Sequence, residues 1–207
     1  MDLAFDRFRL AAATADLGDE PTARAHADCV EFRMDLADAP LDQLADYDGS
    51  LPLIATNRAA WEGGEAGEDE ARLRALREAA GHEAVAAVDV ELASLGTEAG
   101  DRTAAHARDH GAAVIASAHD FEGTPAPPTL RNRLARAARA GDVGKVAVRA
   151  VDPDDALALL SVTRAASRAG ERIATMAMGG AGRHTRALSP VYGSRIGYAP
   201  VDPAEAT

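Results

Sequence analysis

Short apolar runs alternate along the chain with longer segments that mix apolar and polar residues. Most of these runs are apolar on both faces, which is typical of parallel strands that helices cover. They predict strands over residues 8–14, 29–35, 51–56, 84–92, 112–118, 144–150, 172–178 and 194–200.

The mixed segments between these runs predict helices. Several begin with acidic residues or proline and end at glycine, as the helix dipole and the usual C-terminal glycine favour. The clearest predicted helices span residues 68–81, 96–111, 127–141 and 152–170, and weaker patterns cover residues 19–27 and 40–46.

Eight strand–helix alternations indicate an α/β fold with a parallel sheet. Eight is also the number of strands that closes a (β/α)8 TIM barrel, so we predict one such domain over residues 1–207. The chain is shorter than the ~250 residues typical of this fold, so its loops must be short. An open doubly wound sheet is the rival architecture. The G-x-G-x-x-G motif of its dinucleotide-binding version does not follow the first strand.

The charge and cysteine content narrow the possible functions. A net charge of -11 and a pI near 4.9 make binding to a nucleic acid duplex unfavourable. Acidity, abundant alanine and arginine in place of lysine predict a salt-adapted protein, because GC-rich codon use alone explains only the alanine and arginine. Cys29 is the single cysteine, which excludes an intrachain disulfide. No signal peptide or membrane span is recognisable in the sequence, so we expect a cytoplasmic protein.

Lys145 is the only lysine, since the other Lys and Arg residues are all arginines. It lies in an apolar run beside Val143, Val146 and Val148. Burial penalises a charged amine, and a neutral lysine can attack a ketone to form an imine. This reasoning makes Lys145 a candidate nucleophile. The alternative is a residue left by codon bias whose amine reaches solvent.

Other polar residues lie at the ends of predicted strands, where barrel active sites form. His119 ends the fifth strand and is a candidate general base, although a structural histidine is the alternative. Glu31 and Arg33 lie two residues apart and therefore point to one side of their strand. They suit the binding of hydroxyls or a carboxylate, or else form a structural ion pair. Asp89 and Glu91 repeat this spacing.

Two loops carry further candidates. Arg58 and Glu62 follow the third strand, just before two glycines that permit a tight turn. After the seventh strand, a loop with glycines 179, 180 and 182 suits an anion, with Arg183 and Arg186 as its charge partners.

Two histidines lie about one turn apart on the helix predicted over residues 96–111. His106 and His110 have a spacing compatible with metal binding, but they lack a third ligand, and we interpret them as part of a solvated face.

Taken in order, the segments "VEFRMD", "NRAAWEGGE", "VDVEL", "SAHDFEGTP", "GKVAV" and "MAMGGAGRHTR" resemble type I 3-dehydroquinate dehydratases, and archaeal members in particular. The resemblance covers about residues 8–200, and "HDFEGTP" with a downstream lysine is its most specific part. It implies a (β/α)8 barrel that acts on 3-dehydroquinate without metal or other cofactor. Many members are dimers, so we expect a homodimer.

The resemblance also implies roles for individual residues. Lys145 matches the Schiff-base lysine, His119 the general acid/base, and Glu62 an acid close to that histidine. The positions matching the family's substrate-binding residues are Glu31, Phe32, Arg33, Arg58 and Arg186, the last of which matches the arginine that binds the substrate carboxylate.

The sequence departs from the family at two places. The family continues past the eighth strand with an "APGQ" lid loop and a final helix, whereas this sequence ends at "VDPAEAT". Thr207 falls near the position of the lid hydroxyl, and the glutamine has no match. A longer natural chain and a barrel without lid and final helix are both open explanations. At the first strand, Thr14 replaces a substrate-binding serine.

The predicted activity is dehydration of 3-dehydroquinate to 3-dehydroshikimate through an imine on Lys145. A lysine-dependent aldolase is one alternative, which "HDFEGTP" disfavours. A non-catalytic barrel that binds a polyhydroxy acid is the other. The absent "APGQ" favours it, and the intact set of Lys145, His119 and Arg186 disfavours it.

Overall fold

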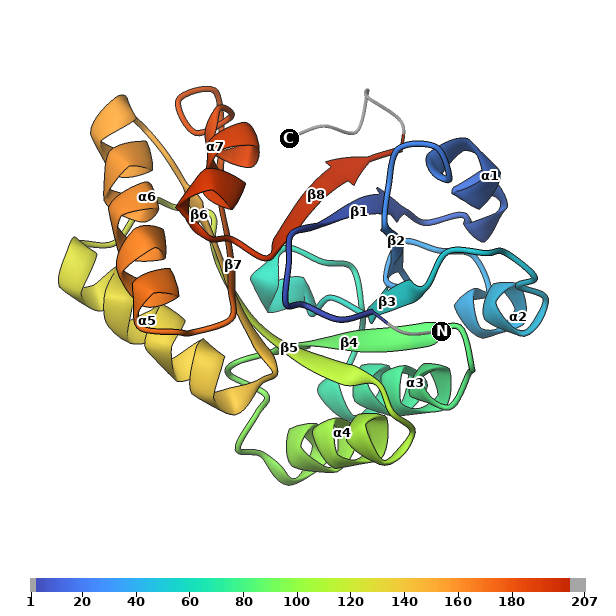
Figure 1. The fold of residues 1–207 in the computed structure, drawn as a ribbon. Coiled ribbons are helices and arrows are strands. Elements are labelled where there is room, and N and C mark those ends of the chain that lie inside the picture. Colours follow the sequence, from blue (N-terminus) through green and yellow to red (C-terminus); the bar gives the residue numbers. More distant parts are fainter. Residues whose placement is uncertain (1–2, 202–207) are drawn as a thin grey trace.

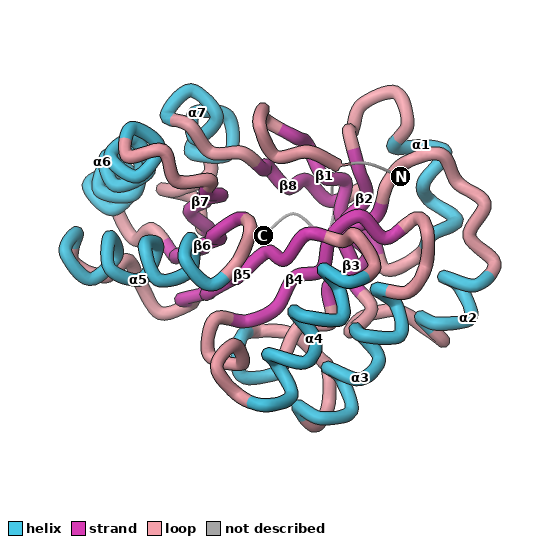
Figure 2. The backbone as a smooth tube through the Cα atoms, turned by 60° about the horizontal axis from the view of Figure 1, so that its bottom comes forward, coloured by secondary structure: helices cyan, strands magenta, loops and turns pink. Residues whose placement is uncertain are grey.

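Eight parallel strands surround the centre of the molecule, and helices cover their outer side (Figures 1 and 2). The computed structural model describes residues 3–201. The predicted (β/α)8 barrel is confirmed. Its strands are β1 Arg9–Thr14, β2 Cys29–Arg33, β3 Leu53–Thr56, β4 Val85–Glu91, β5 Ala113–Asp120, β6 Val143–Arg149, β7 Ile173–Met178 and β8 Ile196–Pro200.

The barrel is nearly closed, with its seam between β7 and β8. The sheet order runs from β7 through β6 to β1 and then β8, and an isolated bridge between Ile173 and Ser194 joins the two ends. Further along β7, the backbone N–H groups of Thr175 and Ala177 donate to the hydroxyls of Ser194 and Thr185 instead of to β8. Side chains therefore complete the barrel where strand pairing stops.

The helices follow the predicted segments closely, with one omission. They are α1 Glu20–Ala23, α2 Pro40–Ala45, α3 Asp69–Ala80, α4 Glu98–Asp109, α5 Pro127–Ala140, α6 Pro153–Arg168 and α7 Thr185–Tyr192. Sequence analysis predicted a glycine-rich loop but no helix over α7. This helix has only eight residues, contains Pro190, and follows a loop of glycines, so its apolar periodicity is too short to recognise.

Local signals explain where the best-predicted helix begins. Asp152 precedes α6, and its carboxylate accepts hydrogen bonds from the backbone N–H groups of Asp154 and Asp155. Such a cap satisfies N–H groups that have no partner within the helix. Among residues 3–201, none of the helices combines the length and the apolar character needed to cross a membrane.

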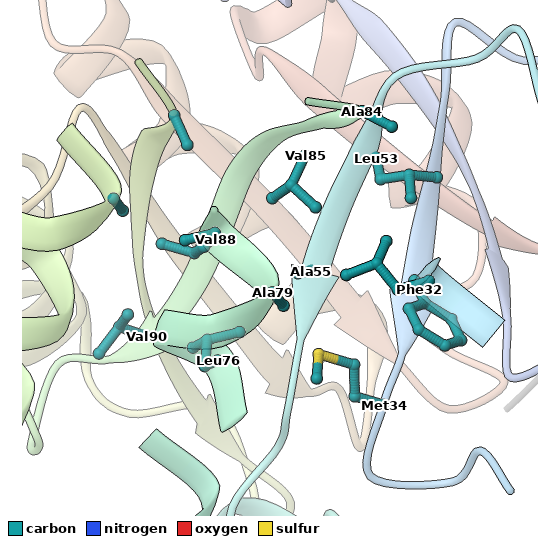
Figure 3. Packing of buried hydrophobic residues seen from close by; sticks show 14 of the residues in the cluster. Phe32, Met34, Leu53, Ala55, Leu76, Ala79, Ala84, Val85, Val88 and Val90 are labelled. Atoms are coloured by element: carbon teal, nitrogen blue, oxygen red, sulfur yellow. The ribbon is translucent and has the colours of Figure 1, made fainter. Parts of the chain in front are cut away.

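Two apolar layers hold the strands in place. The outer layer packs strand side chains against the helices; around β2, β3, β4 and α3 it includes Phe32, Leu76, Val88 and Val90 (Figure 3). The inner layer fills the N-terminal half of the barrel with residues such as Ile115 and several neighbours from other strands. The C-terminal half of the interior is left for polar residues.

Candidate active site

A cavity of about 500 Å³ opens at the C-terminal ends of the strands. This volume suits a small ligand, and the position is where barrel enzymes place their active sites. Seven of the eight predicted site residues line it, namely Glu31, Arg33, Arg58, Glu62, His119, Lys145 and Arg186.

Phe32 is the exception, because its side chain does not line the cavity. Successive residues of a strand point to opposite faces, so Phe32 points away from Glu31 and Arg33. Its ring is fully buried in the outer apolar layer, near Leu53 and Met34 (Figure 3). The resemblance matches Glu31, Phe32 and Arg33 as one motif, but strand alternation places Phe32 on the opposite face of β2 from the other two residues.

Lys145 lies on β6 with 3% of its surface exposed, and its amine is surrounded by polar groups. The Nζ atom is 2.9 Å from Asp89 Oδ2, 3.6 Å from Glu31 Oε1 and 4.2 Å from the centre of the Tyr198 ring. The predicted apolar surroundings of the amine are therefore wrong. Val146 and Val148 pack in the outer layer beneath α5 and α6.

Asp89 is the carboxylate nearest the amine, and two other groups fix it. Ser117 donates a hydrogen bond of 2.5 Å to Oδ1, and Arg58 Nη2 lies 2.8 Å from the same oxygen. Burial alone would raise the pKa of Asp89, but the charges of Arg58 and Lys145 outweigh it and hold this pKa well below its usual range. Asp89 thus remains an acceptor at all ordinary pH values.

Arg58 links this carboxylate to a second one. Its Nη1 donates to Glu91 Oε1 at 2.9 Å and to the Ser117 hydroxyl at 2.7 Å. Glu91 is also bound by Arg72 of α3, at 2.7 Å. Most of the guanidinium is therefore engaged by the protein. Arg58 lines the cavity, and its main contacts within the protein are the carboxylates of Asp89 and Glu91, which it holds together.

Glu62 and His119 form a hydrogen-bonded pair at the cavity wall, with 2.7 Å between Oε2 and Nδ1. Burial raises the pKa of Glu62 to about 7, although Arg58 opposes this shift. Burial, together with the charges of Arg58 and Lys145, lowers the pKa of His119 well below its ordinary value. The imidazole is therefore uncharged near neutral pH, as a general base must be. The turn Ala60–Glu62, which ends at Gly63, brings Glu62 to this position.

Arg33 owes its position to a residue that sequence analysis did not select. Its Nε and Nη2 donate to the two oxygens of Asp35, at 2.9 and 2.7 Å. Such a bidentate pair fixes the plane of the guanidinium. Thr14 also lines the cavity, but its hydroxyl donates to Asp19 Oδ2 at 2.8 Å, so its proton is already engaged within the loop.

The predicted anion site after β7 is only partly assembled. Arg186, on the first turn of α7, lines the cavity, and its Nη1 donates to the backbone oxygen of Tyr198 at 3.0 Å. Arg183 is exposed and does not line the cavity. Thr207, with the region of the expected lid and final helix, lies outside the described residues.

Sequence analysis missed Ser117, Asp35 and Tyr198, and it named Asp89 without giving it a role in the site. Asp89 carried a visible signal, because it shares a strand face with Glu91, but its partner was unknown. Alternation from His119 would also have placed Ser117 inside the barrel. The signals for Asp35 and Tyr198 were weaker, since each was only a polar residue near a strand end.

The remaining histidine pair contributes nothing to this cavity. The rings of His106, on α4, and His110, which caps the end of α4, are tilted against each other with their centres 4.1 Å apart. Within residues 3–201, His, Cys, Asp and Glu side chains nowhere form a group of three suited to a metal ion.

A (β/α)8 barrel with a buried lysine and a Glu–His pair on one cavity defines an enzyme of the lysine-dependent barrel class. Residues 11–207 match the family described as type I 3-dehydroquinase. The chain belongs to this family, and the predicted family and class of enzyme are confirmed.

Proteins named 3-dehydroquinate dehydratase are similar to this chain along nearly all of its length. The protein from Haloarcula marismortui is 57% identical, over 98% of this chain and 90% of its own. The protein from Halobacterium salinarum is 51% identical, over 99% and 92%. Both organisms are halophilic archaea, in agreement with the predicted archaeal and salt-adapted origin.

Solved structures give the same result for the fold. The 3-dehydroquinate dehydratase of Geobacillus kaustophilus has a TM-score of 0.83 and 29% identity, over 95% of this chain and 84% of its own. The type I enzyme of Clostridium difficile, solved with covalently modified comenic acid, has a TM-score of 0.83 and 26% identity, over 97% and 86%.

Proposed function

We propose that this chain dehydrates 3-dehydroquinate to 3-dehydroshikimate through a Schiff base on Lys145. The observation that carries this proposal is the buried amine of Lys145, which shares one cavity with His119. A nucleophilic amine and a neutral imidazole on one cavity are the two groups that imine formation and proton abstraction require. The names of the similar proteins supply the substrate.

The reaction begins when Lys145, having given up a proton, attacks the C3 ketone. Loss of the carbonyl oxygen as water leaves a protonated imine, which withdraws electrons and acidifies the C2 protons. His119 removes one of them, and the resulting enamine expels the C1 hydroxyl. The proton held by His119 leaves with that hydroxyl as water. A second water hydrolyses the imine and releases the product and the amine.

The remaining cavity residues act by binding and orientation. In this proposal Arg186 binds the substrate carboxylate, while Glu31 and Arg33 bind ring hydroxyls. Glu62 orients His119: an ionised Glu62 accepts the Nδ1 proton, which leaves Nε2 free to act as the base. Because these contacts hold the substrate in one place beside Lys145 and His119, a weak nucleophile and a weak base become effective.

Borohydride reduction in the presence of substrate tests the imine. We expect one reduced adduct per chain, on Lys145, located by mass spectrometry of peptides. Lys145→Arg keeps a cation near Asp89 but removes the nucleophile, so turnover should fall by about 10³-fold or more. Protein free of adduct together with full activity of Lys145→Arg would refute the proposal.

The chain offers a matched control for the adduct. Because Lys145 is the only lysine, Arg131→Lys would create a second one on the exposed surface of α5. The adduct should still form on Lys145 alone. An adduct of equal yield on both lysines would indicate nonspecific imine formation and would also count against the proposal.

We also propose that the enzyme is a cytoplasmic homodimer adapted to high salt. The family resemblance supports the dimer, and the net charge of -11 supports the salt adaptation, because salt screens repulsion between acidic groups. Light scattering in molar KCl should give twice the chain mass of 21.4 kDa. A monomer under these conditions would exclude the dimer.

A further inference from the structure

The Schiff base changes the number of hydrogen bonds that Lys145 can donate. An ammonium group has three N–H bonds, whereas a protonated imine has one. Two carboxylates lie close to Nζ, Asp89 at 2.9 Å and Glu31 at 3.6 Å. Only Asp89 is within hydrogen-bond distance, and after the imine forms a single N–H remains for the two carboxylates.

Asp89 is the better placed of the two acceptors. Its side chain is fully buried and does not line the cavity, so substrate cannot compete for it. Glu31 does line the cavity, and the Thr56 hydroxyl donates to the same Oε1 that faces the amine, at 3.0 Å. The shorter distance and complete burial both assign the single N–H to Asp89.

The two oxygens of Asp89 are also divided between separate tasks. Ser117 and Arg58 contact Oδ1, which leaves Oδ2 directed at the amine. Ser117 is the register partner of Lys145 on the neighbouring strand, so this arrangement is built into the pairing of β5 and β6. The carboxylate therefore cannot turn without breaking contacts to two groups.

We propose that Asp89 accepts the single N–H of the protonated imine and thereby selects which of its two geometric isomers forms. This inference rests on the proposed function. A C=N bond is planar and does not rotate freely, so the direction of its N–H decides which neighbouring ring carbon, C2 or C4, lies beside His119. Asp89 is in this sense a positioning residue, because it acts through Lys145 to choose the carbon that loses a proton.

The same assignment leaves Glu31 for the substrate. At 3.6 Å from Nζ, Glu31 Oε1 pairs with the charge of the ammonium group without a hydrogen bond. Glu31 can therefore accept a hydrogen bond from a substrate hydroxyl while Asp89 keeps the N–H of the imine.

Asp89→Asn tests the selection without changing the shape of the side chain. Arg58 requires an oxygen at the Oδ1 position, so the amide NH2 of asparagine would face the amine and remove the acceptor. We expect the borohydride adduct to persist and turnover to fall by about 100-fold, the size expected for misplaced reacting atoms. In D2O, nuclear magnetic resonance should show deuterium at C4 of the substrate or product recovered from Asp89→Asn, and none at C4 with the wild-type enzyme.

Ser117→Ala is the second variant, for use if Asp89→Asn does not fold. It keeps every charge but frees Oδ1 from one of its two contacts, so it should introduce deuterium at C4 to a smaller extent. Its matched control is Ser161→Ala, on the exposed surface of α6, which should introduce none.

The outcomes separate this inference from the proposed function. A wild-type adduct without deuterium at C4 in the folded variants would overturn the selection by Asp89 alone. Loss of the adduct in Asp89→Asn would also overturn it, because Asp89 would then serve the amine itself and not the imine geometry. If the wild-type chain forms no adduct and Lys145→Arg remains active, both the proposed function and this inference fail.

Discussion

The two halves of the barrel interior are built from the same strands but have opposite chemistry. In the half nearer the N-terminal ends of the strands, here called the lower half, the interior is apolar. Two residues further along each strand, in the upper half, the interior is charged or polar. The pairs are Cys29 and Glu31 on β2, Ala87 and Asp89 on β4, Ile115 and Ser117 on β5, and Val143 and Lys145 on β6.

This difference shows how one sheet combines stability with reactivity. Burial of apolar surface in the lower half stabilises the fold by about 25 cal/mol per Å². Burial of charges in the upper half is costly unless each charge is paired, and the network around Arg58 pairs them. The lower half should therefore respond to lost volume, and the upper half to lost charge.

The largest effect should follow from removing the central cation of the upper half. Arg58→Met keeps much of the side-chain volume but leaves Asp89 and Glu91 without their shared partner. We expect a loss of about 3–5 kcal/mol in the free energy of unfolding, as for other broken buried ion pairs, and loss of turnover. Urea denaturation measures the first and an absorbance assay for the conjugated product the second.

Arg131→Met is the control for this change, because Arg131 is exposed on α5. It should alter stability by no more than about 0.5 kcal/mol. Equal destabilisation by the two substitutions would mean that pairing in the upper half contributes nothing particular to stability.

In the lower half, a loss of volume should reduce stability but spare activity. Ile115 is fully buried beneath the site, and Ile115→Ala should cost about 2–5 kcal/mol through lost apolar contacts and the cavity left behind. Well below the melting temperature, kcat should stay within a few-fold of the wild-type value. Ile115→Val should cost about 0.5–1.5 kcal/mol on the same scale. A kcat that falls in proportion to stability would show that the two halves are not separable.

The same contrast explains how far the sequence could predict the structure. Apolar runs and helix-end signals predicted all eight strands and most helices, because these patterns are local. Alternation also places Glu31 and Arg33 on one face. Applied to Phe32, Val146 and Val148, the same rule would have shown that these side chains point outward, toward the helices.

The pairing of charges in the upper half could not be read from the sequence. Asp89 and Lys145 are 56 positions apart, and Arg58 and Ser117 are 59 apart. These contacts depend on the register between neighbouring strands and on barrel closure, which no local pattern specifies. The apolar sequence around Lys145 therefore suggested an apolar environment for its amine, whereas in the structure two carboxylates lie beside it.

The next prediction concerns pH, at the wall of the upper half. Because the pKa of Glu62 is raised to about 7, its carboxylate gains a proton as pH falls through that value. A protonated Glu62 donates to Nδ1 of His119, which moves the imidazole proton to Nε2 and removes the base. The value of kcat/KM should therefore rise with pH through about 7.

Glu62→Gln isolates this ionisation. Its amide oxygen can still accept the Nδ1 proton, but the side chain no longer titrates. The rise in kcat/KM near neutral pH should disappear, while the maximum rate falls by about tenfold through loss of the orienting charge. An unchanged pH profile in this variant would assign the ionisation to another group.

The smallest effect should occur where the two halves meet. Tyr198 belongs to the apolar cluster, yet the face of its ring lies 4.2 Å from Lys145 Nζ. Burial raises the pKa of its phenol well above the ordinary value, so the hydroxyl stays neutral. Among the described residues this buried hydroxyl has no hydrogen-bond partner.

Tyr198→Phe removes that hydroxyl and keeps the ring beneath the amine. No hydrogen bond is broken, so stability should change by less than about 1 kcal/mol and kcat should stay within about twofold. Tyr198→Leu removes the ring as well and should reduce kcat further, because the amine loses a rigid neighbour. Thermal unfolding and initial rates on the two variants measure both effects. If kcat and stability fall as far in Tyr198→Phe as in Tyr198→Leu, the hydroxyl of Tyr198 and not its ring supports the amine of Lys145.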